Sequence, residues 1–246
     1  MAPNVMELPA SPEKNASISF RMMYSGIQIA SDQRRTGFLN GQPAPELPAC
    51  VRVTHTGFDW MNKKQQLLQG IAELFFRNGY EKTAISDICK HLDISRPGLY
   101  YHFSTKQEIL YEIISDFLDK IIPTLRANFD NKGDPKEKLR TFIRSSIEFF
   151  IEYPAQAKVV IYEIHSLEEK YAKALNPKRQ EYFGAVRNII IEILKDSGLE
   201  SDPTVATFAL IGTLNWVVQW YRPEGKIDPD TLAKSLEELF LRALKA

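Results

Sequence analysis

The segment 83–106 constrains the fold more than any other part of the chain. Four apolar residues in its first half recur at the spacing of one helical face, namely Ile85, Ile88, Cys89 and Leu92. Asp93 interrupts that pattern, and Ser95 is a suitable N-cap for a second helix. The segment therefore predicts two short helices joined by a tight turn.

The second of these helices combines an apolar face with an unusual polar one. Pro97 falls in its first turn, where the missing N–H costs little. Leu99 and Phe103 are four residues apart and are expected to pack inward. The outer face then holds Arg96, Gly98, Tyr100, Tyr101 and His102. An ordinary helical hairpin is the alternative, but this outer face favours a helix-turn-helix, whose second helix enters the DNA major groove.

Residues 64–106 also resemble the N-terminal domain of TetR-family transcriptional regulators. The resemblance lies in Phe75 followed by Gly79-Tyr80, in Thr83 at a helix start, and in Leu99-Tyr100-Tyr101-His102-Phe103 with Lys106. It implies that Arg96, Pro97 and Gly98 face bases, and that phosphate is held by Tyr100, Tyr101, His102 and Lys106. The remaining predicted DNA-binding residues are Ser86 and Ser95.

The chemistry of these side chains agrees with the resemblance. Arginine can bridge guanine O6 and N7, while tyrosine hydroxyls and lysine suit phosphate oxygens. The alternative for Tyr100 or Tyr101 is that its side chain mainly packs between this helix and the rest of the protein. Because Gly98 has no side chain, sequence choice is expected to depend on Arg96 and on DNA shape.

The start of the first helix departs from the family pattern. Ala84 stands where a small hydroxyl residue is common, so a capping box with Asp87 is predicted to be incomplete. Thr83 is the alternative cap, which would shift the helix start by one residue.

Positive charge is concentrated in the same region of the sequence. The whole chain has 31 basic and 31 acidic residues, but residues 62–106 hold seven basic and four acidic ones. Residues 107–246 hold 19 basic and 22 acidic residues. The positive excess therefore coincides with the predicted phosphate contacts.

The sequence lacks the motifs of several other classes of protein. Two cysteines, Cys50 and Cys89, give no disulfide framework, and no apolar run is long enough for a bilayer, so we expect a cytoplasmic protein without a membrane partner. The four scattered histidines form no metal motif, and there is no glycine-rich phosphate loop or nucleophile elbow. We expect no metal, no cofactor and no enzymatic activity.

The remainder of the chain predicts an all-α fold without a sheet. Prolines and apolar periodicity mark expected helices at residues 108–122, 135–153, 155–167, 168–175, 177–196, 203–221 and 229–244. Pro123 is expected to end the first of these helices, and Pro177 to begin the fifth. Residues 61–107 are predicted to form an N-terminal three-helix helix-turn-helix DNA-binding domain, and residues 108–246 a C-terminal helical ligand-binding and dimerisation domain. Residues 1–60 are expected to be a disordered extension, unless translation begins at Met61.

The last two expected helices, from Pro203 to Tyr221 and from Pro229 to Leu244, are the predicted homodimer surface. The first is apolar around most of its circumference and must be covered on several sides. The family resemblance implies the same arrangement. The alternative is that both helices only close the core of one chain.

Aromatic residues of the C-terminal part predict a site for a small hydrophobic effector. Residues 215–223 resemble a branch of the family that responds to acyl-CoA thioesters, and arginines would meet the anionic CoA. The alternative is ordinary core packing for the aromatics and a structural role for the histidine. The predicted ligand-binding residues are Phe149, Phe150, Tyr153, Tyr162, His165, Tyr182, Phe183, Arg187, Trp216, Trp220, Tyr221 and Arg222.

Together these observations predict a homodimeric repressor released from a palindromic operator in double-stranded DNA by such an effector. One alternative is the same fold sensing a hydrophobic drug or an aromatic acid to control efflux. Another is a helical protein–protein interaction module that does not bind DNA.

Overall fold

A computed structural model describes residues 38–39, 42–43, 60–129 and 133–244. The chain divides into two compact units, Met1–Thr56 and Gly57–Ala246. In the first unit, strands β1 (Phe38–Leu39) and β2 (Gln42–Pro43) pair antiparallel. The expectation of no sheet is wrong for this pair, because strands of two residues are too short to give an alternating pattern. The expected disorder of residues 1–60 falls almost wholly outside the described residues.

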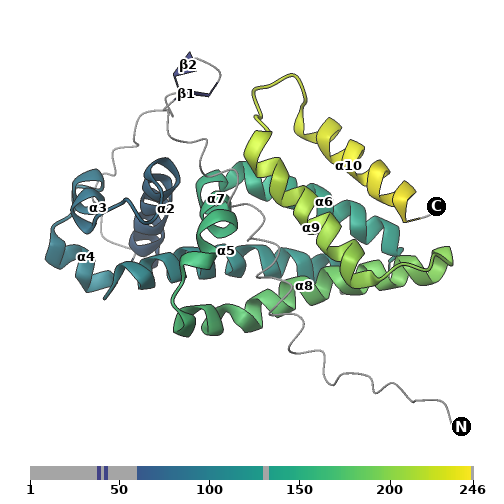
Figure 1. Cartoon of the computed structure of the whole chain (residues 1–246), viewed down its shortest axis with the longest axis horizontal. Helices are drawn as coiled ribbons and strands as arrows, with labels where there is room; N and C mark the ends of the chain where they lie inside the picture. The colour runs from purple at the N-terminus through teal and green to yellow at the C-terminus, as the bar shows by residue number, and fades with distance from the viewer. Residues whose placement is uncertain (1–37, 40–41, 44–59, 130–132, 245–246) are drawn as a thin grey trace, which may run out of the picture. The chain divides into compact units, whose positions relative to one another are not determined.

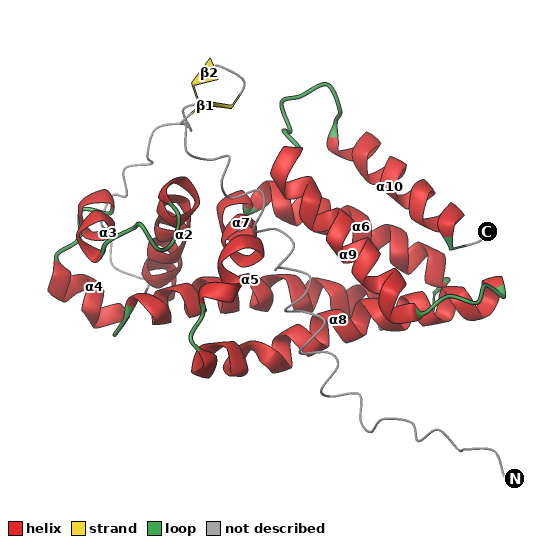
Figure 2. Ribbon diagram, in the orientation of Figure 1, coloured by secondary structure: helices red, strands yellow, loops and turns green. Residues whose placement is uncertain are grey.

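The second unit is helical throughout its described elements, which confirms the all-α class (Figures 1 and 2). We call its first three helices the head and its later helices the body. The head consists of α2 (Trp60–Asn78), α3 (Ile85–His91) and α4 (Arg96–His102). The body consists of α5 (Lys106–Phe129), α6 (Pro135–Glu152), α7 (Pro154–Glu163), the 3-10 helix η3 (Ile164–Ser166), α8 (Glu169–Ser197), α9 (Pro203–Trp220) and α10 (Pro229–Ala243).

The head closes around a small apolar core. Helix α2 packs on α3, and α3 packs on α4. The side chains of Ile71, Phe75, Ile88, Leu99 and Phe103 are almost completely buried in the head. The helical spacing of these residues explains why α2, α3 and α4 each place one face in this core.

The body is built around α5, which leaves the head and runs along α8 (Figure 1). Helices α6 and α7 also pack on α5, and α7 reaches back to α2. Helix α9 packs mainly on α8, and α10 packs on α6. The body is therefore joined to the head both through α5 and through α7.

Two prolines that were predicted to mark helix boundaries instead lie inside helices. Helix α5 continues through Pro123, and α8 runs through Pro177 from Glu169. Both prolines are exposed, whereas Leu125 in the turn after Pro123 and Leu175 in the turn before Pro177 are buried. Burial of such leucines favours the continued helix against the cost of an internal proline, about 3 kcal/mol. The separate helices predicted at 168–175 and 177–196 are one helix.

The boundaries of the other body helices are close to the predictions. Helices α6, α9 and α10 each begin at the expected proline and end within one residue of the expected end. The helix predicted at 155–167 is shorter, because α7 gives way to η3 after Glu163. Within the described residues, no helix combines the length and hydropathy needed to cross a bilayer.

Candidate nucleic-acid interface

The turn between α3 and α4 fixes where α4 begins. Asp93 has a φ of 50°, in the left-handed region that aspartate tolerates better than most residues. The N–H of Ile94 donates to the carbonyl of Cys89 at 3.0 Å. Ser95 then caps α4, because its Oγ accepts the N–H of Gly98 at 3.1 Å. The predicted cap and turn are confirmed.

Two glycines allow close contacts in the head. A Cβ at Gly98 would lie 3.0 Å from Cγ1 of Ile94 and 3.1 Å from Oγ of Ser95. A Cβ at Gly70 in α2 would lie only 2.5 Å from Cδ2 of Leu92, so the Leu92 side chain would have to move. Gly98 therefore keeps space for the cap of α4, and Gly70 keeps space for the packing of α2 on the end of α3.

Helix α3 begins as the incomplete capping box predicts. Asp87 accepts the N–H of Ala84, the N-cap residue, at 2.9 Å, and Ala84 has no hydroxyl to return a bond. The alternative in which Thr83 caps the helix is wrong. Its buried hydroxyl donates instead to the carbonyl of Gly79 at 2.8 Å, where α2 ends with a φ of 83°.

Helix α4 presents most of the predicted DNA-binding residues on its accessible face. Leu99 and Phe103 point into the core, as predicted, while Tyr100 is 47% exposed and Tyr101 is 72% exposed. Each of these tyrosines offers a ring face and a hydroxyl group to a binding partner. The other predicted residues outside the core are exposed at Ser86, Ser95, Arg96 and Pro97 and half-buried at Gly98 and His102.

His102 lies at the end of α4 beside the first turns of α2. Partial burial and the nearby cations Lys63 and Lys64 hold the pKa of His102 below its ordinary value. Its ring makes an edge-to-face contact with Tyr101 at 5.2 Å between ring centres. At neutral pH the uncharged imidazole therefore offers one N–H donor.

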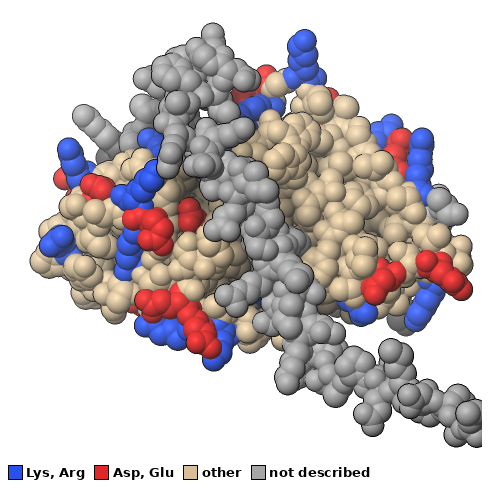
Figure 3. Space-filling view, in the orientation of Figure 1, with Lys and Arg blue, Asp and Glu red and all other residues tan. Residues whose placement is uncertain are grey.

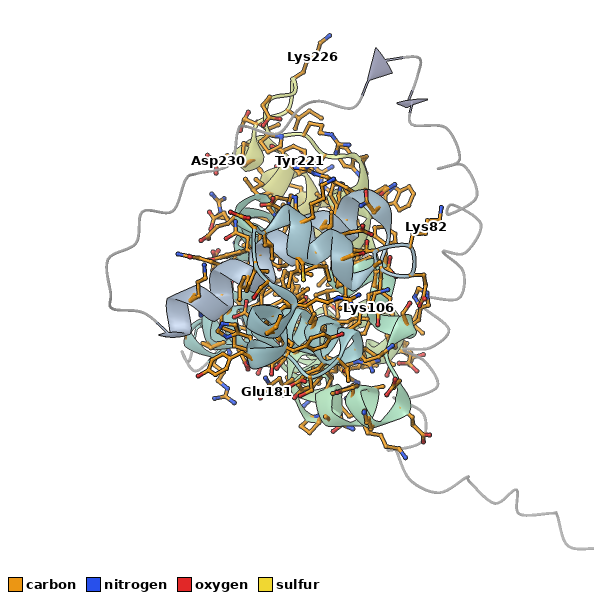
Figure 4. All side chains as sticks on the ribbon, turned by 90° about the vertical axis from the view of Figure 1, so that its left-hand side faces the viewer. Lys82, Lys106, Glu181, Tyr221, Lys226 and Asp230 are labelled. Atoms are coloured by element: carbon orange, nitrogen blue, oxygen red, sulfur yellow. The ribbon has the colours of Figure 1, made fainter. Side chains whose placement is uncertain are left out.

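Lys106 does not point to the exposed face of α4. Its Nζ donates to the carbonyl of Glu81 at 3.3 Å and lies 4.2 Å from the centre of the Tyr80 ring. In Figure 4, Lys82 points away from the ribbon, whereas Lys106 lies against it. Burial, and secondarily nearby carboxylates, raise the pKa of Tyr80 to about 12. Lys106 thus joins the start of α5 to the turn after α2.

The predicted ligand-binding residues do not form one cluster. The rings of Phe149 and Tyr153 lie 4.7 Å apart between centres with their planes tilted by 47°, and Phe149 lies 4.9 Å from Phe117 of α5. The Nζ of Lys120 lies 4.7 Å from the centre of the Tyr153 ring. Phe150 is buried nearby in the same helix. These residues lie where α5 and the end of α6 meet.

The other predicted ligand-binding residues have separate partners. Tyr182 lies beside Phe142, and Phe183 contacts Phe208 with the ring planes tilted by 38°. Tyr162 donates to Oε1 of Gln219 at 2.7 Å, and Arg187 donates to Oγ1 of Thr204 at 3.3 Å. Tyr221 donates to the carbonyl of Ile227, while Arg222 donates to the carbonyl of Tyr221. Trp216 (54% exposed), Trp220 (44% exposed) and His165 lie at the surface.

Three residues with notable polar contacts were not singled out from the sequence. Glu237 in α10 is buried, its Oε1 has no hydrogen-bond partner among the described residues, and it pairs with Nη2 of Arg144 at 3.6 Å. Glu163 of α7 accepts the backbone N–H of Tyr80 in the turn after α2, whereas Gln107 of α5 donates to the carbonyl of Ser166 in η3, within the body. The position of Glu237 four residues before Leu241, on the buried face of α10, was the one local signal for it.

Charge is unevenly distributed over the surface. Helix α9 contains no charged residue, and Figure 3 shows a broad area without Lys, Arg, Asp or Glu over it. In the described part of the chain, no group of three or more His, Cys, Asp or Glu residues is placed to hold a metal ion.

Comparison with known proteins places both parts of the second unit in one family. Residues 67–113 match the model of bacterial regulatory proteins of the tetR family, and residues 132–244 match the tetracyclin repressor-like C-terminal domain. The HTH-type transcriptional repressor KstR2 of Mycolicibacterium smegmatis is 29% identical over 70% of this chain and 86% of its own length. The HTH-type transcriptional activator FasR of the same organism is 24% identical over 69% of this chain and 77% of its own.

Solved structures agree with this assignment. The TetR-family regulator PfmR from Thermus thermophilus superposes with a TM-score of 0.65 at 29% identity, over 72% of this chain and 97% of its own. AibR, crystallised with isovaleryl coenzyme A and operator DNA, superposes with a TM-score of 0.66 at 20% identity over the same shares. With its capped, exposed α4 on a three-helix head and a matching helical body, the chain belongs to the TetR family of DNA-binding transcriptional regulators.

Proposed function

We propose that this protein is a homodimeric repressor that binds a palindromic operator through α4 and is released by a small hydrophobic effector. The exposed face of α4 carries the proposal, because Arg96, Tyr100 and Tyr101 are held outward while Leu99 and Phe103 anchor the helix. Repression is favoured by the KstR2 relatives, which are named as repressors.

Within this proposal, the exposed residues have different roles. Arg96 reads a guanine in the major groove, and Tyr100, Tyr101 and His102 hold phosphates. Ser86, Ser95, Pro97 and Gly98 complete the contact surface. Lys106 is not among the proposed phosphate contacts, because its ammonium group binds the backbone carbonyl of Glu81 and lies over the Tyr80 ring.

We assign the homodimer to α9 together with α10. Val205, Trp216 and Trp220 are exposed apolar residues of α9, which has no charges. Leu239 is 59% exposed on α10. A second copy that covers these side chains would remove a large apolar area from water. Trp216 and Trp220 therefore belong to the proposed dimer rather than to the effector site.

The effector is proposed to be an acyl-CoA thioester that binds in the body beside Phe149 and Tyr153. The ring group formed with Phe117 offers apolar contact, and the nearby ammonium of Lys120 offers a positive charge. Structural similarity to AibR, which was crystallised with isovaleryl coenzyme A, supports this class of compound. An effector bound here would shift α5 and change the spacing of the two α4 helices. It acts only if it binds that shifted state more tightly.

DNA binding and effector release are tested separately. The full-length protein is titrated with DNA from upstream of its own gene at several salt concentrations, because phosphate contacts predict a steep fall in affinity with salt. Acyl-CoA thioesters, aromatic acids and hydrophobic drugs are then added to the complex. Weak binding without salt dependence would contradict the DNA-binding role. Release by drugs or aromatic acids, and not by thioesters, would contradict only the effector assignment.

A further inference from the structure

Gln156, in the first turn of α7, has a buried amide that no other group of the described chain satisfies. Only 3% of the residue is exposed. The amide offers two N–H donors and one carbonyl acceptor, and within the described residues none of these groups makes a hydrogen bond. Because burial removes most of the water that would bind such groups, an unpaired amide destabilises the folded chain.

Every other buried polar or charged residue in the described part of the chain has a partner. Ser115 accepts a hydrogen bond from the ammonium of Lys178 at 2.6 Å. Glu237 pairs with Arg144 at 3.6 Å. Three hydroxyls donate to the backbone carbonyl four residues before them, namely those of Thr83, Ser146 and Thr207. Gln156 is therefore the exception among these residues.

Both polar atoms of the Gln156 amide still touch accessible space. Neither Nε2 nor Oε1 is among the described side-chain atoms that are completely enclosed and lack a hydrogen-bond partner. The small exposed fraction of the residue therefore includes the polar end of the side chain. A small polar group can reach the amide there, although nearly all of the residue is covered.

The first turn of α7 lies beside the rings proposed to contact the effector. Phe149 is in the last turn of α6 and lies 4.9 Å from Phe117 of α5. Helix α7 begins at Pro154, directly after Tyr153, and packs on α5 (Figure 1). The N–H of Ala157 donates to the carbonyl of Tyr153 at 2.9 Å, so this turn is fixed to the end of α6. A buried amide and a group of aromatic rings thus lie where three helices meet.

We propose that Nε2 of Gln156 donates a hydrogen bond to the carbonyl oxygen of the effector and thereby selects effectors that carry such a carbonyl. Ligand sites are mostly apolar and contain a few polar groups that fix the orientation of the ligand. In an acyl-CoA thioester, the carbonyl is the first polar group after the acyl chain. An acyl chain against the rings of Phe117, Phe149 and Tyr153 would bring that carbonyl beside the first turn of α7. The inference rests on the proposed function and adds a specificity residue to its effector site.

The test compares two glutamines that differ in their hydrogen bonding. Gln156→Met and Gln156→Leu each replace the buried amide by an apolar side chain of similar size. Gln107→Met is the matched control, because the amide of Gln107 binds the backbone of Ser166 and Glu168. Each full-length protein is titrated, without DNA, with octanoyl-coenzyme A and isovaleryl-coenzyme A. The matched thioethers S-octyl-coenzyme A and S-isopentyl-coenzyme A, which lack the carbonyl, are titrated in parallel.

The wild type and Gln107→Met are expected to bind a thioester at least about fivefold more tightly than its matched thioether, because the thioether cannot accept the bond from Nε2. In Gln156→Met and Gln156→Leu, this preference should fall below about twofold. A preference that stays at the wild-type value in both Gln156 variants would overturn the proposal. Loss of the preference in Gln107→Met would do the same, because the preference would then not depend on Gln156 in particular.

Thermal unfolding without ligand distinguishes this role from a structural one. Removal of an unpaired buried amide should leave the unfolding midpoint of both Gln156 variants unchanged or raised. Gln107→Met loses two hydrogen bonds, so its midpoint should fall. A lower midpoint in both Gln156 variants would show that the amide has a partner within the protein, and would overturn the proposal.

A failure of the thioester assignment has a different outcome. If the wild type binds no thioester but another carbonyl compound releases it from operator DNA, the thioester part of the proposed function is wrong. The same comparison, made with that compound and an analogue without the carbonyl, then decides the role of Gln156. Equal binding of that compound and its analogue by the wild type would overturn the inference, and the absence of binding by every carbonyl compound would overturn it together with the effector class.

Discussion

At the scale of single residues, Arg96 has the widest hydrogen-bonding capacity on the exposed face of α4. It follows the Ser95 cap directly, so the backbone that carries its guanidinium is fixed by the bond from Gly98 to Ser95. A fixed start of α4 matters because bidentate recognition of guanine depends on the direction of the guanidinium group as well as on its charge.

Arg96→Ala is expected to reduce discrimination between the operator and single-base variants by about tenfold, because one good bidentate contact contributes about 1–3 kcal/mol. Affinity for unrelated DNA should change little. Lys90→Ala, which removes an exposed cation from α3, is the control and should weaken binding to all sequences alike. Competition binding with operator variants measures both effects. Unchanged base preference in Arg96→Ala would contradict the assignment.

His102 gives the proposed interface a dependence on pH. In the free protein the pKa of His102 is lowered by partial burial and by Lys63 and Lys64. A phosphate beside the ring would stabilise the imidazolium and raise that pKa in the complex. The complex then binds more protons than the free protein, so affinity rises as pH falls through the interval between the two pKa values.

Operator titrations from neutral to mildly acidic pH measure this effect. His102→Gln should show a flatter pH profile than the wild type, whereas His91→Gln on α3 should keep the wild-type slope. Identical slopes for wild type and His102→Gln would mean that no phosphate lies beside the ring.

The buried carboxylate of Glu237 depends on Arg144, which reaches it from α6 at 3.6 Å. Arg144→Ala would leave that carboxylate buried without its cation, so the free energy of unfolding is expected to fall by about 1–3 kcal/mol. Arg140→Ala is the control, because Arg140 pairs with an exposed carboxylate of its own helix, and such pairs contribute about 1 kcal/mol or less. Urea unfolding at one protein concentration compares the two. Equal losses in both variants would show that Glu237 does not need Arg144.

At the scale of elements, α4 was predictable because every signal for it is local. Ser95, Leu99 and Phe103 lie within nine residues, and they set the cap and the buried face. The end of α5 and the start of α8 were not predictable from Pro123 and Pro177. Whether a helix continues through a proline depends on packing partners distant in sequence.

The polar residues also differ in whether the sequence alone could predict their contacts. The exposed face of α4 follows from helical periodicity, so its residues could be named from the sequence. The Gln107 amide meets a carbonyl 59 positions away, and Lys106 turns to a carbonyl 25 positions away. No local pattern encodes such pairs, since the folding of the intervening helices brings them together.

Pro123 inside α5 is expected to lower the stability of the protein. Pro123→Ala restores an N–H and removes a ring from the helix interior, so the free energy of unfolding is expected to rise, by at most about 3 kcal/mol. Pro223→Ala, in the exposed loop after α9, is the control and should be neutral or slightly destabilising. Thermal and urea unfolding compare the two. A loss of stability in Pro123→Ala would indicate that the proline shapes α5 favourably.

At the scale of the whole molecule, a regulator that reads two half-sites requires two copies held at a fixed distance. The uncharged helix α9 is the surface that such an assembly would cover, with Trp216 and Trp220 as its largest exposed groups. Aromatic anchors of this kind commonly dominate the energy of an interface.

Trp216→Glu is expected to convert the proposed dimer to a monomer, because it would place a carboxylate in the apolar surface assigned to the dimer contact. Operator affinity should fall together with dimerisation, since half-site contacts no longer add. Ile227→Glu changes an exposed apolar residue in the loop between α9 and α10 and should remain dimeric. Light scattering after gel filtration measures mass, and a dimeric Trp216→Glu protein would contradict the α9 interface.

The close approach of Gly70 to Leu92 has a consequence for how such a protein diverges. A Cβ at Gly70 would lie 2.5 Å from Cδ2 of Leu92 at the end of α3, so the packing that positions α4 involves residues outside its proposed DNA-contact surface. The exposed side chains of that helix are then free to vary with little penalty for folding. Under the proposed role of α4, new operators can be acquired by exchanging a few surface residues, while a side chain at Gly70 would first have to displace the end of the Leu92 side chain.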